Sequence, residues 1–208
     1  MDQIPILMQP PQLLALAAAL GWASGFRLYA AVFLTGLAGY MGWIDLPQGL
    51  QVLAHPGVLA ASGFMLFVEF FADKIPYVDS VWDAVHTLIR IPAGAALAAG
   101  ALGADNAAMG WIAALVGGSL AATSHATKMT ARAAANTSPE PFSNWGASFT
   151  EDAMVASGIW LAFAHPAVFL VMFVVFLLLL AWIIPKVWRG IRAVFARLNP
   201  PRAEGSGA

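Results

Sequence analysis

The sequence contains no cysteine and few charged residues. Without cysteine the chain can form no disulfide, no thiolate nucleophile and no cysteine-based zinc or iron–sulfur site. Only 10% of its 208 residues are Asp, Glu, Lys or Arg, and ten basic residues against eleven acidic ones give a net charge of -1. The chain therefore has no overall basic field of the kind that holds nucleic acid, and we expect no nucleic-acid partner.

Apolar residues, by contrast, dominate the chain. They make up 60% of it, and the mean hydropathy of +0.75 lies far above that of a soluble domain. A helix needs about 20 apolar residues to cross the hydrocarbon core. The sequence has six apolar runs, at residues 12–42, 56–75, 92–104, 109–131, 147–164 and 166–184. We therefore predict an all-α, polytopic transmembrane helical bundle of about six spans.

Two of these runs have unusual lengths. The first is too long for one upright helix and contains Gly21, Ser24 and Gly25 near its middle, so we expect it to tilt strongly or to break there. The third, residues 92–104, is too short. It spans only if the helix before it supplies a turn, and otherwise it is a re-entrant piece buried by protein.

The basic residues indicate the orientation. Lys and Arg collect on the cytoplasmic side of membranes, and five follow the last apolar run: Lys186, Arg189, Arg192, Arg197 and Arg202. Counting back through six spans places Lys74, Arg90, Lys128 and Arg132 on that side, and the loops near Trp43 and Asn106 on the other. We therefore predict an inner-membrane protein with both termini in the cytoplasm. Residues 1–185 form one transmembrane domain, and residues 186–208 form a basic tail with a disordered end that suits anionic membrane lipids.

A sequence pattern occurs twice. His55-Pro56 opens one apolar run that ends at Ile75-Pro76, and His165-Pro166 opens another that ends at Ile184-Pro185. Such similarity between residues 55–92 and 165–200 is typical of a duplicated transporter half. The alternative is that His-Pro and Pro recur here only because they are common at helix ends.

Residues 78–90 have the pattern of an interfacial amphipathic helix. One face is apolar, and the opposite face carries Asp79, Asp83, His86 and Arg90. The two carboxylates and the imidazole are ligands suited to a divalent cation, so Asp79, Asp83 and His86 form a weak candidate metal site. A solvated polar face would need the same pattern.

Ionisable residues inside apolar segments are costly and are functional candidates by default. Arg27 lies near the middle of the first run, Glu69 lies in the second, and Asp73 follows one helical turn later. We expect Arg27 to pair with Glu69, since neither can remain unpaired at that depth. Such a pair lies on a solute or proton path, or it only holds two helices together.

A polar stripe ends the fourth run. His125, Lys128, Arg132 and, less closely, Asn136 recur at helical spacing, and small residues before them indicate that the stripe faces protein. Three cations on one face attract a small anion or a phosphate, with Glu69 or Asp73 as a proton-sensitive partner. Two alternatives remain open: the cations extend to the inner interface, or the carboxylates neutralise them in a structural network.

The segment after this stripe is rich in turn residues. Residues 136–145 read NTSPEPFSNW, and we expect them to form a fixed lid over His125, Lys128 and Arg132. Ser148 and Glu151 then match a capping box, which assigns Glu151 and its neighbour Asp152 to a helix start.

Two long blocks of the sequence resemble a known family. They are EFFADKIPYVDSVWDAVHTLIRIPAGA at 69–95 and HATKMTARAAANTSPEPFSNW at 125–145, and SGFRLYAAVFLTG near the start is similar too. Together they resemble the bacterial membrane family catalogued as domain of unknown function 4126, over roughly residues 12–185. The resemblance implies no established activity. It implies motif positions at Asp73, Lys74, Pro76, Asp79, Trp82, Asp83, His86, Arg90, His125, Lys128, Arg132, Asn136, Ser138, Pro139, Glu140 and Pro141.

Three functions are compatible with these features. The leading one is a transporter or permeation pathway for a small anion or phosphorylated solute, with substrate-binding residues at Arg27, His125, Lys128, Arg132 and Asn136. The second is a membrane scaffold that binds lipids or a partner. The third is a metal-dependent membrane enzyme, although no familiar catalytic motif is present. We expect no cofactor, and a homo-oligomer remains open.

Overall fold

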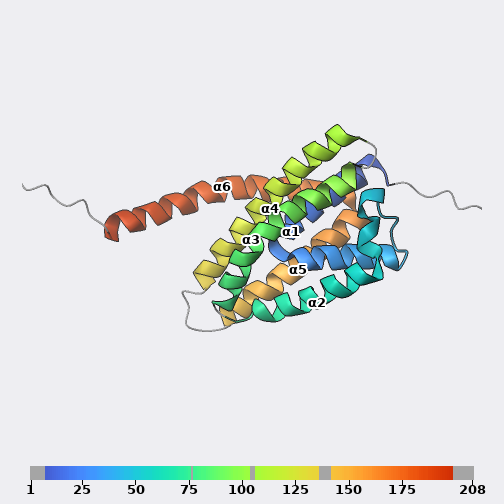
Figure 1. Cartoon of the computed structure of the whole chain (residues 1–208). Coiled ribbons are helices and arrows are strands. Elements are labelled where there is room, and N and C mark those ends of the chain that lie inside the picture. The colour runs from blue at the N-terminus through green and yellow to red at the C-terminus, as the bar shows by residue number, and fades with distance from the viewer. Residues whose placement is uncertain (1–7, 76, 104–105, 136–141, 199–208) are drawn as a thin grey trace, which may run out of the picture. The chain divides into compact units, whose positions relative to one another are not determined.

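A computed structural model describes residues 8–75, 77–103, 106–135 and 142–198. Its described elements are all helices: α1 (Pro10–Tyr40), the 3-10 helix η1 (Gln48–Ala54), α2 (Pro56–Ala72), α3 (Val78–Leu102), α4 (Ala107–Ala135), α5 (Phe142–Ala164) and α6 (Pro166–Leu198) (Figure 1). The all-α prediction is confirmed. The chain divides into two compact units, residues 1–169 and 170–208. The site described below lies within the first unit.

Several of these helices are long and apolar enough to cross a membrane. Four qualify singly: α1, α3, α4 over Ala107–Ala133 and α6 over Pro166–Ile183. A fifth span results if η1 and α2, which meet at an angle of 68°, are counted as one broken span. The sequence predicts about six. The difference is α5, whose first half carries polar residues that lower its hydropathy.

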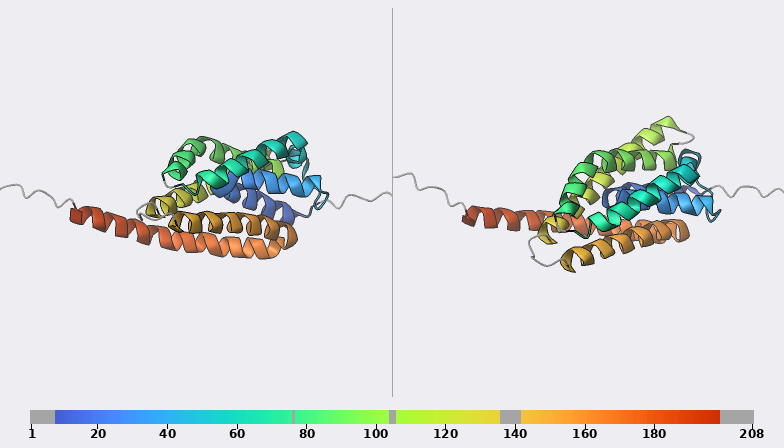
Figure 2. Two further views of the ribbon diagram at one scale, coloured as in Figure 1. Left: turned by 90° about the horizontal axis from the view of Figure 1, so that it is seen from below. Right: turned by 60° about the horizontal axis from the view of Figure 1, so that its bottom comes forward.

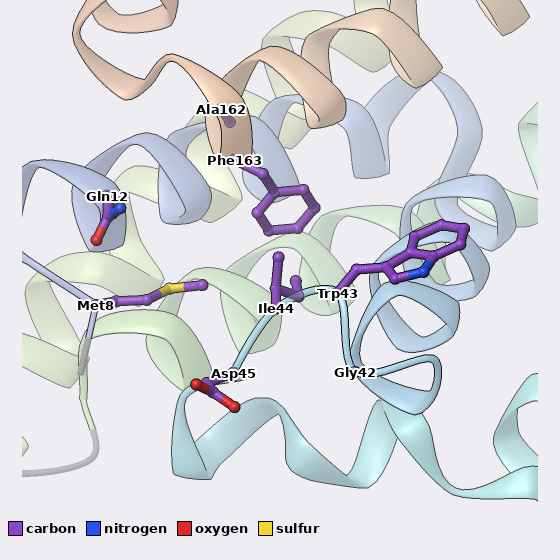
Figure 3. Close-up of a pocket in the computed structure, with 8 residues that line it drawn as sticks. All are labelled: Met8, Gln12, Gly42, Trp43, Ile44, Asp45, Ala162 and Phe163. Atoms are coloured by element: carbon purple, nitrogen blue, oxygen red, sulfur yellow. The ribbon is translucent and has the colours of Figure 1, made fainter. Parts of the chain in front are cut away.

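Helix α1 breaks at Arg27, whose backbone is not helical (φ -144°, ψ 74°). The ends of a straight 31-residue helix would lie about 45 Å apart. Here Gln12 and Gly42 instead line the same cavity of about 300 Å³ (Figure 3). The chain therefore doubles back at Arg27, and α1 is a hairpin with a first arm at 10–26 and a second arm at 28–40 (Figures 1 and 2).

The hairpin confirms the expected break and corrects the expected topology. Met8 and Trp43 line one cavity at the open end of the hairpin, whereas a single crossing by residues 12–42 would place them at opposite ends. The predicted cytoplasmic N-terminus depended on that single crossing and loses its basis. Arg27 marks the opposite end, which we call the tip.

Single cysteines test this arrangement, because the chain has none of its own. We expect Gln9→Cys and Asp45→Cys to be modified by an impermeant thiol reagent from the same side of the membrane. Tyr77→Cys, which follows α2 at the tip end, should react from the other side. Modification of Gln9→Cys together with Tyr77→Cys would contradict the hairpin.

Close packing around the hairpin depends on small residues. Gly21 in the first arm lies against the backbone of Gly117 in α4, and Gly94 in α3 lies against Ala121. The second arm packs in the same way on η1, where Gly36 meets the carbonyl of Leu53. Small side chains let helix backbones approach closely, which is typical of helix packing in membranes.

Helix α3 runs without interruption through both the amphipathic stretch and the short apolar run. The turns before residue 92 therefore supply the length that the short apolar run lacks. This was one of the two expectations for residues 92–104. The predicted interfacial helix is wrong, because the polar face is turned into the bundle: Asp83 and Arg90 are fully buried, whereas Leu88 is 82% exposed. A membrane supplies the apolar surroundings that this outer face needs.

The two copies of the His-Pro pattern begin alike and end differently. His55 caps α2 by accepting a hydrogen bond from the Gly57 amide at 3.1 Å, and α6 likewise begins at Pro166. Helix α2 ends at Ala72, whereas α6 continues through Pro185 to Leu198. The duplication stays a prediction.

The first part of the expected basic tail, residues 186–198, belongs to α6 and is helical. Residues 199–208 lie outside the described residues.

Candidate functional site

Among the described residues, nine ionisable side chains from five segments are joined by ion pairs around the hairpin tip. We call them the charge network: Arg27 in α1, Glu69 in α2, Asp73 just after α2, Asp83 and Arg90 in α3, Lys128 and Arg132 in α4, and Glu151 and Asp152 in α5. All of them are buried except Asp152, whose side chain is 27% exposed. Charges so far from water require partners.

Asp73 lies at the centre of the network. Its Oδ2 atom is 3.1 Å from Lys128 Nζ and 3.8 Å from Arg132 Nη2, and it also forms an ion pair with Arg27. Burial would raise the pKa of Asp73, but the charges of Lys128, Arg27 and Arg132 outweigh it and hold the pKa below its ordinary value. These three cations therefore favour the ionised form of Asp73.

Arg90 and Lys128 extend the network across α2 and α3. The guanidinium of Arg90 contacts Glu69 Oε1 at 2.5 Å and Asp83 Oδ1 at 2.6 Å. Lys128 Nζ lies 3.1 Å from the same Asp83 oxygen as well as from Asp73. One continuous chain of ion pairs thus runs from Glu69 to Asp73 through α3 and α4.

Helix α5 closes the network on the other side. Arg27 Nε lies 3.1 Å from Asp152 Oδ1, and Arg27 Nη2 donates to Ser148 Oγ at 2.8 Å. Arg132 contacts Glu151 at 3.0 Å. The capping-box prediction is wrong, because α5 begins at Phe142 and Ser148 lies inside it. Sequence reasoning thus missed Glu151 and Asp152, although two acids in an apolar segment were a usable signal.

The predicted pair of Arg27 and Glu69 is also wrong. Among the described residues, Glu69 forms its ion pair with Arg90, and Arg27 pairs with Asp73, one turn further along the chain. The reason is the hairpin. Because Arg27 is at the tip, its side chain meets the end of α2 and not its preceding turn.

The stripe on α4 faces protein, as predicted. The break at Arg27 leaves backbone carbonyls of the first arm without helical partners. His125 Nδ1 lies 3.3 Å from the carbonyl oxygen of Gly25, and Lys128 Nζ donates to that of Phe26 at 3.2 Å. A cation at the carboxyl end of a helix is electrostatically favourable. Lys128 and Arg132 are buried and paired, so they do not extend to the interface.

The weak metal candidates have other partners. Asp83 is held by Arg90 and Lys128, and His86 lies between Tyr29 and its own helix, 3.1 Å from the tyrosine hydroxyl and 2.8 Å from the Trp82 carbonyl. Among the described residues, no group of three or more His, Asp or Glu side chains is placed to hold a metal ion. The metal hypothesis gains no support.

The expected lid is described only at its end. Residues 136–141, including the candidate Asn136, lie outside the described residues. Further along, Trp145 Nε1 donates to the carbonyl of Lys74 at 3.2 Å, and Arg132 Nη1 donates to that of Asn144 at 3.0 Å. The described end of the segment therefore contacts the ends of α2 and α4.

Lys74, next to Asp73, has an ammonium group that lies over the ring of Phe70. Burial lowers the pKa of this group.

Comparison with known proteins gives a family and no activity. The model of the family described as "Domain of unknown function (DUF4126)" matches residues 14–186, so the chain belongs to this family. No curated protein and no solved structure matches the chain. Function must therefore be argued from the charge network itself.

Proposed function

We propose that this DUF4126 member is a small membrane transporter or permeation pathway, in which a small anion or phosphorylated solute binds at the charge network together with a proton. The observation that carries the proposal is the imbalance of the network. Among the described residues joined by ion pairs at the tip of the broken helix, five carboxylates face four cationic side chains. Ionisable groups inside a membrane bundle characteristically mark solute and proton paths.

The helix break supports the same function. In many transporters, interrupted helices bring backbone carbonyls and half-helix ends to a binding site within the membrane. Here the carbonyls of Gly25 and Phe26 reach His125 and Lys128 at the edge of the network. At the tip, the cationic side chains thus have two kinds of partner, backbone carbonyls and carboxylates. A solute could replace one kind while the other is kept.

Anion binding at this site requires that a protein carboxylate give way. In this structure carboxylates hold the cations on which a solute anion would bind. Arg90 is held by Glu69 and Asp83, and Lys128 and Arg132 are held by Asp73, Asp83 and Glu151. When a carboxylate of the network takes a proton on its oxygen, its attraction for its cation falls and the cation accepts the solute instead. Anion uptake is then coupled to proton uptake.

The distribution of basic residues suggests an orientation in the membrane. Among the described residues of the first unit, the loops at the open end of the hairpin carry no Lys or Arg, whereas Lys74 lies at the tip end. We propose a bacterial inner membrane as the protein's location. We place the tip end in the cytoplasm, according to the distribution of basic residues.

A scaffold is the second candidate, because the contacts of Lys128 suit a purely structural role. Its ammonium contacts Asp73, Asp83 and the Phe26 carbonyl, and so joins the hairpin to α2, α3 and α4. A network used only for this purpose would give a stable protein that moves nothing.

Flux measurements separate the two candidates. We expect purified protein in liposomes to take up a small anion, screened with inorganic phosphate, acetate and chloride, faster when a proton gradient is imposed. Lys128→Gln should lower that rate by ~10-fold or more, as expected when one partner of a buried charged contact is removed. Lys186→Gln is the matched control, since Lys186 lies in α6 over the ring of Trp182.

Folding is followed in the same preparations by thermal melting. If Lys128→Gln does not fold, Lys128→Arg keeps the charge, changes its geometry and should still lower the rate. Absence of anion flux in unaltered, folded protein, with and without a gradient, would remove the transport proposal and favour the scaffold.

A further inference from the structure

We propose that Glu69 is the carboxylate of the charge network that holds the proton. The inference names the proton site of the proposed transporter, and so its role in transport rests on that proposed function. The protonation itself is a property of the folded protein and is tested independently of flux.

Glu69 has the fewest cationic partners among the buried acids of the charge network. Its only ion pair among the described residues is with Arg90, at 2.5 Å. By comparison, Asp73 has three cationic partners, Glu151 has three and Asp83 has two. A negative charge on Glu69 is therefore compensated least.

Even this one partner is shared. The Arg90 guanidinium contacts Glu69 with Nη2 and Asp83 with Nη1. Asp83 has Lys128 as a second cation at 3.1 Å, whereas no second cation forms an ion pair with Glu69 in the described part of the chain. Of the two carboxylates that share Arg90, Glu69 is the one whose neutralisation costs less electrostatic energy.

The second oxygen of Glu69 is also unsatisfied. Glu69 is completely buried, and its Oε2 atom has no hydrogen-bond partner among the described residues. An ionised oxygen in this condition bears a large desolvation cost, which a neutral carboxylic acid avoids. A proton on Oε2 also leaves Oε1 free to accept the hydrogen bond from Arg90.

The charge balance of the whole network agrees with this assignment. With Glu69 protonated, four carboxylates face four cations. With Glu69 ionised, one uncompensated negative charge remains in apolar surroundings, where it is costly. Among the described residues, Glu69 also interacts electrostatically with Lys128 from α4, with Arg27 and Tyr29 from α1, and with Asp73 just after its own helix.

Infrared difference spectroscopy on the purified protein in lipid tests the assignment directly. We expect a pH-dependent carbonyl stretch of a protonated carboxylic acid in the unaltered protein, and its loss in Glu69→Gln. Asp83→Asn removes the competitor for Arg90, so the band should titrate at lower pH than in the unaltered protein. A band that persists in Glu69→Gln, or that disappears in Asp152→Asn instead, would overturn the proposal.

Thermal melting gives a second readout. Glutamine imitates a protonated glutamic acid in shape and charge, so Glu69→Gln should melt within about 4 °C of the unaltered protein. A loss as large as that of Asp73→Asn would show that Glu69 is ionised, contrary to the proposal.

The two proposals fail separately. An infrared band that is lost in Glu69→Gln, in a protein that shows no flux, supports the proton site and removes the transport proposal. Proton-driven anion flux that is unchanged in Glu69→Gln keeps the transport proposal and overturns the role of Glu69 in proton coupling.

Discussion

Replacement of Asp73 by Asn should lower the free energy of unfolding by about 3–5 kcal/mol, the loss typical of breaking a buried ion pair from one side. Asp73 is fully buried and is the shared partner of Arg27, Lys128 and Arg132. Asparagine keeps the size of the side chain but removes its charge. Three cations then face a neutral amide with no water to solvate them, which is why the expected loss is large.

Melting of the purified protein in detergent measures this loss. The matched control is Asp45→Asn, which makes the same chemical change at an exposed position after α1 and should remain within about 0.5 kcal/mol of the unaltered protein. Adding Lys128→Met to Asp73→Asn should recover part of the stability, because it removes one of the three cations that faced Asp73. Strictly additive losses, or an Asp73→Asn protein that melts like the unaltered one, would show that Asp73 does not hold the network together.

The helical architecture and much of the site could be predicted from the sequence. Apolar runs long enough to span a membrane are a direct consequence of the bilayer, and the glycines and serine near residue 24 indicated a break. Helical spacing also placed His125, Lys128 and Arg132 on one face, and the small residues before them indicated correctly that this face is buried. These are local patterns that a helix converts directly into geometry.

The direction of the chain after the break could not be predicted. Glycine and serine permit a kink, a strong tilt or a full reversal, and only contacts with the rest of the bundle select among them. The reversal at Arg27 moved the N-terminal arm to the side of Trp43, and it changed the partner of Arg27 from Glu69 to Asp73. One unpredicted turn therefore changed both the course of the chain and the partner of Arg27.

The polar face of α3 illustrates a second limit. Spacing showed that Asp79, Asp83, His86 and Arg90 share a face, but a polar face looks the same whether it meets water or the polar interior of a membrane bundle. The outcome depended on α2 and α4, which supply Glu69 and Lys128 to Arg90 and Asp83. Such pairing across helices is invisible to a pattern within one helix.

Gly25→Ala should destabilise the protein by about 1–3 kcal/mol, the usual loss when a well-packed interior receives an extra methyl group. A Cβ atom at Gly25 would lie 1.9 Å from Ser124 Oγ, 2.3 Å from the carbonyl oxygen of Ala121 and 2.8 Å from the amide nitrogen of His125. Two of these three atoms belong to the backbone of α4, which cannot rotate away. The hairpin tip must therefore move from α4, and this also weakens the contacts of Phe26 with Lys128.

A matched glycine in α5 shows whether this loss is steric. Gly146 also lies inside a helix, but a Cβ atom there would meet nothing within 4 Å. Gly146→Ala should therefore leave the melting temperature unchanged or raise it, since alanine is favoured over glycine in a helix by up to ~1 kcal/mol.

Combining Gly25→Ala with Ser124→Gly then tests the geometry of the tip. Ser124→Gly removes the closest atom but leaves the Ala121 carbonyl oxygen at 2.3 Å from the new methyl group, so only part of the stability should return. Ser124→Gly alone supplies the reference for the double variant, because it also removes the hydrogen bond from Ser124 to the Trp22 carbonyl. Full recovery in the double variant, or a Gly25→Ala protein as stable as the unaltered one, would contradict this prediction. Either result would mean that the hairpin tip lies further from α4 than in this structure.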